Sequence, residues 1–165
     1  MTSTATTTIK VAVGFVDIVG YTRLAASVGP DDLARFIRDF EEQAIGLVAD
    51  NGGRLVKLIG DEEMFVALDP SEAVAVASAM LDAFDGTKAA PRAGIAYWEV
   101  VALGGDYYGE IVNLASRITD QAVPGEVLVD EATASATSEQ RFERAGRRQL
   151  KGFDQPVALS ALVVV

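Results

Sequence analysis

The sequence contains no cysteine and no histidine among its 165 residues. Without cysteine the chain has no disulfide framework, no thiolate nucleophile and no zinc ribbon. Without histidine, Ser-His-Asp and Cys-His catalysis and histidine-ligated metal sites are excluded. Any catalysis must therefore use carboxylates, lysine, arginine, amides and hydroxyls, and any metal bound by such hard oxygen ligands is Mg²⁺, Mn²⁺ or Ca²⁺.

Basic residues are also scarce, since 14 lysines and arginines face 24 acidic residues and give a net charge of −10. This balance argues against nucleic acid and anionic membrane surfaces as partners. A polyanionic substrate would need a metal ion and a few well-placed cations to overcome it. No apolar run reaches the roughly 20 residues of a membrane span, and no basic segment precedes an apolar one at the start. The expected compartment is the cytoplasm, without membrane insertion.

The rest of the composition is typical of one globular domain, with 50% hydrophobic and 23% charged residues. A chain of this length can bury a single core without covalent cross-links. Residues 1–8 (MTSTATTT) form a threonine-rich segment that we expect to be disordered, and residues 9–165 are expected to be the domain.

Hydrophobic spacing predicts an α+β fold. A β-branched apolar run at 9–18 predicts a strand buried on both faces, followed by a short helix after Gly20. The expected order is a ferredoxin-like βαββαβ core followed by a C-terminal αββ extension, whose elements along the chain are α-β-(α)-β-β. The remaining expected elements are helices at 30–50, after Asp69 and after Gly109, and strands at 54–59, 63–68, 92–103, 126–129, 141–147 and 157–165.

Two carboxylates have positions that suggest metal binding. Asp17 ends an otherwise apolar strand, and Asp61 lies at the tip of the hairpin predicted around Gly60. The first strand and the hairpin are neighbours in the expected fold, so two metal ions between these tips would suit in-line phosphoryl displacement. The alternatives are a helix cap for Asp17 and a turn residue for Asp61. The loop after Asp17 would offer phosphate-binding backbone N–H groups, namely those of Ile18, Val19, Gly20, Tyr21 and Thr22.

Four further polar residues are candidates for a functional role, and each also has an ordinary structural interpretation. Lys57 lies inside an apolar strand, where a lysine that only extends to solvent is the alternative. Asp106 follows two glycines in a predicted turn, and an ordinary turn residue is the alternative. Asn113 and Arg117 are four residues apart on one helix, opposite its apolar stripe, and a merely solvated face would look the same.

In order and spacing, the segments GFVDIVGYTRL (14–24), VKLIGDEEM (56–64) and DYYGEIVNLASRI (106–118) resemble the catalytic domain of class III nucleotidyl cyclases. VNLASR is the most specific of these motifs, and the resemblance extends from about Ile9 to the C-terminus. It implies that Asp17 and Asp61 bind two Mg²⁺ or Mn²⁺ ions per site, with the Ile18 carbonyl as a minor ligand.

The resemblance also assigns the substrate contacts. It implies that Lys57 and Asp106 select the purine, that Asn113 positions the ribose and that Arg117 stabilises charge on the α-phosphate. Members of the family act as head-to-tail dimers in which the metal residues come from one chain and these four from the other. The chain is therefore expected to form a homodimer with two shared sites.

Chemistry favours ATP over GTP, because a lysine donor and an aspartate acceptor match N1 and N6 of adenine and mismatch guanine. Two features depart from the family pattern. Glu99 stands where a triphosphate-binding arginine is frequent, and the triphosphate lysine is expected at Lys151, with Arg147 and Arg148 as alternative cations.

The sequence therefore predicts an adenylate cyclase that forms 3′,5′-cyclic AMP, with no residue identified as general base. Guanylate cyclase and a catalytically idle nucleotide-binding or dimerisation module are the alternatives. A diguanylate cyclase shares the initial β-α-β-β order, but the chain has no Gly-Gly-Asp/Glu-Glu-Phe hairpin.

Overall fold

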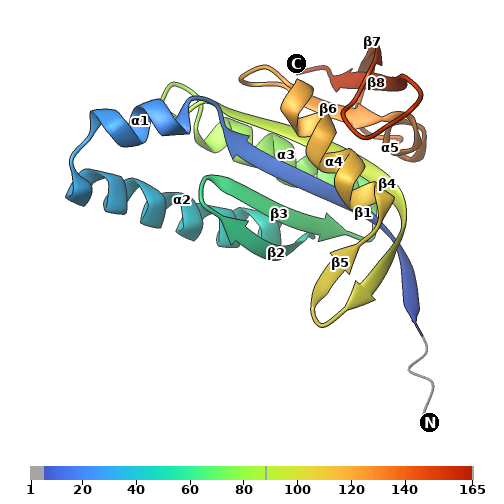
Figure 1. Ribbon diagram of the computed structural model, residues 1–165, viewed down its shortest axis with the longest axis horizontal. Coiled ribbons are helices and arrows are strands. Elements are labelled where there is room, and N and C mark those ends of the chain that lie inside the picture. The colour runs from blue at the N-terminus through green and yellow to red at the C-terminus, as the bar shows by residue number, and fades with distance from the viewer. Residues whose placement is uncertain (1–5, 88, 165) are drawn as a thin grey trace.

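The computed structural model describes residues 6–87 and 89–164, in which one sheet is flanked by helices on both faces (Figure 1). The expected disordered segment lies outside the described residues as far as position 5. Thr7 and Thr8, expected in that segment, instead pair with Ala102 and Val101 as the start of the first strand. The elements are β1 Thr7–Ile18, α1 Tyr21–Ser27, α2 Pro30–Asp50, β2 Arg54–Ile59, β3 Glu62–Ala67, α3 Pro70–Ala83, β4 Pro91–Leu103, β5 Asp106–Tyr108, α4 Glu110–Gln121, β6 Val127–Asp130, α5 Glu131–Ala136, β7 Phe142–Arg148 and β8 Val157–Leu162.

The strand order β2-β3-β1-β4-β6-β8-β7 contains the expected core. Strands β2, β3, β1 and β4 are antiparallel neighbours, which is the ferredoxin-like arrangement. The extension continues the sheet through β6, which pairs in parallel with β4, and through the antiparallel strands β8 and β7. The short helix expected in the extension is the six-residue helix α5, between β6 and β7. The structure adds β5, which pairs only with β4.

Strand β1 is the centre of both halves of the core, as its continuous apolar run predicted. Its alternate side chains face opposite sides, because successive residues of a strand point to opposite faces. Ala12 and Val16 belong to the cluster beneath α2 and α3, whereas Val11, Val13 and Phe15 belong to the cluster beneath α4. None of the described helices combines the length and apolar character needed to cross a membrane.

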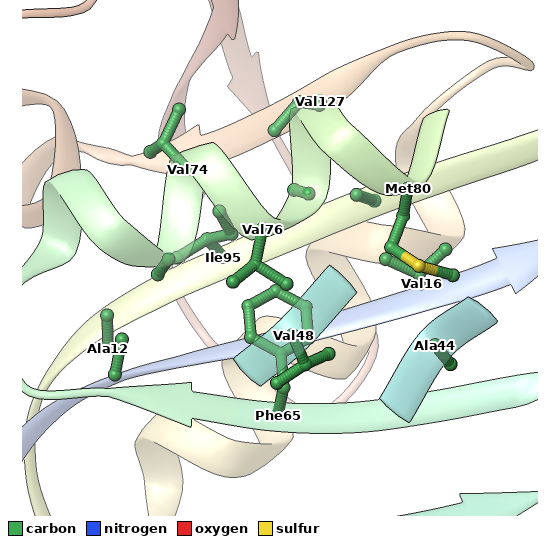
Figure 2. Close-up of a cluster of buried hydrophobic side chains, with 14 of the residues drawn as sticks. Ala12, Val16, Ala44, Val48, Phe65, Val74, Val76, Met80, Ile95 and Val127 are labelled. Carbon is green, nitrogen blue, oxygen red and sulfur yellow. The ribbon is translucent and has the colours of Figure 1, made fainter. Parts of the chain in front are cut away.

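The cluster beneath α2 and α3 depends on one close approach. Figure 2 shows the Phe65 ring among Val48 of α2, Val76 of α3 and the strands below. Phe65 lies opposite Gly14 of β1, and a Cβ at position 14 would lie 2.2 Å from the ring. Glycine at this position therefore makes room for the aromatic side chain, since no real Cβ tolerates that contact.

Glu63 is an acidic residue inside this apolar cluster. It pairs with Val16 and Leu58 on the face that α2 and α3 cover, and none of its surface is exposed. Within the described chain, neither carboxylate oxygen has a hydrogen-bond partner. Burial raises the pKa of Glu63 to about 8, because an apolar environment disfavours the charged form.

The buried carboxyl predicts a pH-dependent stability. Its folded-state pKa of about 8 exceeds the ordinary value of 4.5. The folded state therefore carries no charge penalty below pH 4.5 and loses stability as the pH rises toward 8. Relative to Glu63→Gln, the wild type should lose up to about 1.4 kcal/mol of unfolding free energy per pH unit in that interval.

Urea denaturation between pH 4.5 and 8, with chelator present, measures this difference. Glu42→Gln, at an exposed position of α2, is the control and should run parallel to the wild type. Parallel curves for Glu63→Gln as well would contradict the buried, uncompensated carboxyl.

Candidate active site

The two predicted metal ligands are Asp17, near the end of β1, and Asp61, in the turn between β2 and β3. Strand β1 pairs with β3 so that Val16 lies opposite Glu63. Asp17 therefore comes opposite Glu62, the residue that follows Asp61 in the hairpin turn between β2 and β3. This confirms that the end of the first strand and the tip of the hairpin adjoin.

Asp17 is held by an arginine that the sequence did not single out. Nε of Arg92 donates to Oδ1 of Asp17 at 2.7 Å, and Nη2 donates to Oδ2 at 3.2 Å. Only 13% of the Asp17 side chain and 22% of the Arg92 side chain are exposed. Nη1 of Arg92 also donates to the carbonyl oxygens of Asp120 and Ala122, at 3.0 and 3.2 Å. The guanidinium thus joins the end of β1 to the C-terminal end of α4.

Negative charge is concentrated around this pair. The pKa of Glu62 is raised to about 7, first by burial and then by the charges of Asp17, Asp120 and Asp61, against the lowering effect of Arg92. Of these causes, the three carboxylate charges are the ones that a bound cation would offset. The pKa of Arg92 is raised in turn, chiefly by its hydrogen bond to Asp17.

The donor set at these tips suits a hard divalent cation. Among residues 6–87 and 89–164 no three acidic side chains form a group that could hold a metal ion. Mg²⁺, however, is commonly bound by one or two carboxylates together with water and substrate phosphates. The carboxylates of Asp17 and Asp61 and the Ile18 carbonyl fit that requirement. Arg92 takes one hydrogen bond at each oxygen of Asp17, and each oxygen keeps a second lone pair that could bind a metal ion.

The phosphate-binding loop expected after Asp17 is partly committed to the fold. The Val19 N–H donates to the Ala90 carbonyl at 2.9 Å, so the expectation of a free amide at Val19 was wrong. This bond continues the pairing of β1 with β4 by one residue. Gly20 then has a positive φ of 77°, and helix α1 begins at Tyr21. The roles of Ile18, Gly20, Tyr21 and Thr22 stay predictions.

The two residues predicted to select the purine contact each other. Nζ of Lys57 lies 2.9 Å from Oδ2 of Asp106. Oδ1 of Asp106 accepts from the Tyr107 N–H at 2.7 Å. Hydrogen bonding to Lys57, and then to the Tyr107 backbone, lowers the pKa of Asp106. Lys57 is therefore more than a lysine extending to solvent, because its ammonium group has a specific acceptor.

Helix α4 presents Asn113 and Arg117 away from its buried side, as predicted. Ala115 and Ile118 are fully buried, whereas Asn113 is exposed and 40% of the Arg117 side chain is exposed. Nη1 of Arg117 lies 3.4 Å from Oδ2 of Asp120.

The three C-terminal cations differ in their contacts. Lys151 is exposed in a turn between β7 and β8, next to the buried Leu150, and Arg147 is exposed on β7. Arg148 instead donates to the carbonyl oxygens of Gln121 and Ala145. Arg148 is thus committed to tying β7 to α4. Glu99, the residue that departs from the family pattern, is exposed on β4 opposite Lys10.

Comparison with known proteins agrees with the motifs. The family described as "Adenylate and Guanylate cyclase catalytic domain" matches residues 94–160. An adenylate cyclase of Streptomyces coelicolor is 42% identical over 127 residues, which cover 76% of this chain and 33% of that protein. An adenylate cyclase of Glutamicibacter nicotianae is 35% identical over 157 residues, covering 91% of this chain and 39% of that protein. The chain belongs to the adenylate and guanylate cyclase catalytic domain family.

Solved structures agree on the fold of this cyclase domain. The adenylyl cyclase CyaB from P. aeruginosa superposes with a TM-score of 0.87 at 24% identity, covering 98% of this chain and 97% of that one. The cyclase domain spans 33–39% of the length of the two named sequence relatives.

Sequence reasoning missed Arg92, although a signal existed. Arg92 begins an apolar strand in the same way that Asp17 ends one. Two opposite charges in neighbouring apolar strands indicate a pair, but the register that sets Asp17 opposite Arg92 is a property of the folded sheet.

The Asp17–Arg92 contact should contribute measurably to stability. Replacing Arg92 by Met leaves a mostly buried carboxylate and two carbonyl oxygens without their donor. We expect the free energy of unfolding to fall by about 2–3 kcal/mol. In the control, Arg35→Met, the lost ion pair to Asp32 is exposed, and the change should stay below about 0.5 kcal/mol. Urea denaturation measures the free energy of unfolding of both variants. Equal decreases in the two variants would contradict a structural role for Arg92.

Proposed function

We propose that this domain is an adenylate cyclase that converts ATP to 3′,5′-cyclic AMP and pyrophosphate at sites shared between two copies of the chain. The observation that carries the choice of ATP is the Lys57–Asp106 pair, in which a donor and an acceptor lie 2.9 Å apart. Relatives named as adenylate cyclases at 35–42% identity support the reaction. The cytoplasm, where ATP is available, is the compartment that this reaction implies.

The pair matches adenine for a reason of hydrogen-bond polarity. Adenine presents an acceptor at N1 and a donor amine at N6, so the Lys57 ammonium and the Asp106 carboxylate each have a counterpart. Guanine reverses both edges and would leave both groups without a partner on the base, at a cost of about 1–3 kcal/mol each once the bound base excludes water. The lowered pKa of Asp106 keeps its carboxylate an acceptor near neutral pH.

In the proposed reaction the ribose 3′ oxygen attacks the α-phosphorus. The new bond closes the cyclic phosphodiester, the bond from the α-phosphorus to the bridging oxygen breaks, and pyrophosphate leaves with that electron pair. The 3′ proton passes to water or to a phosphate oxygen, since no residue is assigned as general base. Asn113 orients the ribose, Arg117 stabilises the charge that develops on the α-phosphate, and Lys151 binds the triphosphate.

Two Mg²⁺ or Mn²⁺ ions bound by Asp17, Asp61 and the Ile18 carbonyl would supply Lewis-acid stabilisation of the attacking and leaving oxygens. The protein's own part is to present both carboxylates at adjoining tips of the sheet. Arg92 orients the Asp17 carboxylate through one hydrogen bond to each oxygen, which leaves a lone pair on each for such an ion.

Purified protein incubated with ATP or GTP and with Mg²⁺ or Mn²⁺ tests the proposal through the cyclic product formed. Cyclic AMP as the main product supports it. Formation of cyclic GMP from GTP, at a higher kcat/KM than that of cyclic AMP formation from ATP, favours guanylate cyclase. Tight nucleotide binding without turnover favours the idle nucleotide-binding module.

The metal assignment predicts loss of activity without loss of fold. Asp17→Asn keeps an acceptor for Arg92 but removes the charge, and Asp61→Asn does the same at the hairpin tip. Each should lower kcat/KM for ATP by about a hundredfold or more, since each removes an electrostatic contribution to the transition state. The matched control is Asp82→Asn, at an exposed position of α3. Wild-type turnover in either variant, measured as cyclic AMP formed, would remove that residue from the metal site.

The shared site predicts that two inactive variants rescue each other. A mixture of Asp17→Asn and Arg117→Ala chains forms mixed dimers with one intact and one doubly damaged site. With random pairing half the dimers are mixed, so activity should recover to about a quarter of wild type.

A site within one chain is the alternative, and one observation favours it. Arg117 contacts Asp120, whose other oxygen lies 3.9 Å from the guanidinium that binds Asp17. A one-chain site predicts no recovery on mixing. Absence of recovery, with subunit exchange verified by differently tagged chains, would reject the shared site and leave the metal assignment intact.

A further inference from the structure

The base-selecting Asp106 lies on a weakly supported part of the molecule. Strand β5 has three residues and pairs only with the end of β4. Figure 1 shows this β4–β5 hairpin, residues 101–108, extending beyond the body of the sheet. Backbone pairing alone therefore leaves the orientation of Asp106 to side-chain contacts with neighbouring elements.

Those contacts come from β2, and Arg54 makes most of them. Nη1 of Arg54 donates to the Tyr107 hydroxyl at 2.7 Å, and Nη2 donates to the Gly105 carbonyl at 3.2 Å. The guanidinium carbon also lies 5.7 Å from the centre of the Tyr107 ring. One planar side chain thus contacts the residues immediately before and after Asp106.

A bulge in β2 makes this geometry possible. Arg54 and Lys57 are three residues apart and would point to opposite faces in a regular strand. The register shifts between Leu55 and Lys57, so that Arg54 pairs with Val66 and Lys57 with Met64. Both partners belong to the cluster on the α4 face of the sheet, against which Tyr107 of the hairpin also packs. Arg54 and Lys57 therefore point to the same face of the sheet as Tyr107. In regular pairing, counted back from Lys57, Arg54 would lie opposite Ala67 and point toward α2 and α3.

Arg54 and Asp106 also share a cavity. A cavity of about 260 Å³ is lined by Arg54, Gly104, Gly105, Asp106 and Tyr107, among others. The arginine fork is a rigid donor pair, which suits it to fixing two acceptors at once. A lysine at this position would bind only one of them well.

We infer that Arg54 is a positioning residue for nucleotide choice: it fastens the β4–β5 hairpin to β2 through Tyr107 and Gly105 and so holds Asp106 in place to recognise the base. The inference rests on the proposed function for its substrate, ATP, but the contacts that carry it are independent of the metal site. Arg54 acts through Asp106 and does not itself read the base.

Three variants test this role. Arg54→Met removes both hydrogen bonds and keeps an apolar stem, Arg54→Lys keeps the charge without the fork, and Tyr107→Phe removes only the hydroxyl acceptor. Arg38→Met, at an exposed position of α2, is the control. In Arg54→Met we expect the ratio of kcat/KM for ATP over GTP to fall about tenfold, mainly through a higher KM for ATP. Arg54→Lys and Tyr107→Phe should fall between this variant and the wild type.

Amide hydrogen exchange supplies a readout that needs no turnover. The amides of residues 105–108 should exchange about tenfold faster in Arg54→Met, with the rest of the domain unchanged. A purely structural role would instead speed exchange throughout and lower kcat for both nucleotides while leaving their ratio intact. That result would overturn the inference.

A double-mutant cycle identifies the route of the effect. In an Asp106→Asn background, Arg54→Met should no longer change nucleotide preference, because the group it positions has lost its function. An undiminished effect there would mean that Arg54 contacts the nucleotide directly, which would also overturn the inference. If the wild type forms no cyclic AMP, the proposed function fails while the exchange experiment still tests the hairpin contact. If amide exchange is unchanged in Arg54→Met, Arg54 does not hold the hairpin and the inference is rejected, while the proposed function is unaffected.

Discussion

The antiparallel pairing of β1 with β3 on one side and β4 on the other is the constraint from which the rest of the domain follows. The strand is apolar on both faces, so it is stable only when helices cover both sides of the sheet. The same pairing fixes where charges can occur. Asp17 is the acidic residue of β1, near the end of the strand, and it is mostly buried but paired with Arg92. Its neighbours across the sheet, Glu62 and Arg92, are then determined by register.

Two acidic residues on β3, one partly and one fully buried, lower the stability of the folded state when they ionise. Glu62 and Glu63 both have raised pKa values, near 7 and 8, and burial is the first cause in each case. Glu62 faces the carboxylate cluster, whereas Glu63 faces apolar side chains. Two consecutive residues of β3 thus differ in effect: the Glu62 carboxyl contributes to the electrostatic field of the candidate site, whereas the Glu63 carboxyl only destabilises the fold. Functional sites commonly carry such locally unfavourable groups.

Much of the fold could be predicted because hydrophobic spacing and helix-start residues act locally. The helix at 30–50 has a proline at its first position and a regular apolar stripe, and the structure gives it the same bounds. The hairpin around Gly60 and the cap at Asp69 follow from turn and cap chemistry in the same way. Strand β5 has three residues, which is too short to produce a periodic signal.

The candidate site was predictable where motifs name residues and unpredictable where register decides. Lys57 and Asp106 were expected together, and they contact each other. Arg92 and Arg54 were missed because their importance lies in partners 75 and 53 residues away in sequence. The amide of Val19, expected to face phosphate, is instead used to extend the sheet. A backbone N–H near a strand end can either pair with the next strand or bind a ligand, and sequence spacing alone does not show which of the two it does.

The bulge at Val56 means that the number of residues in β2, and not only their identity, determines which side chains face the hairpin. Residues before it are out of phase by one with residues after it, and this offset alone brings Arg54 onto the same face as Lys57. A related domain could keep every residue that touches the nucleotide and still lose the support of its recognition hairpin by pairing this strand regularly. If Arg54 positions Asp106 as proposed, insertions and deletions at a distance from the bound base would also change nucleotide preference.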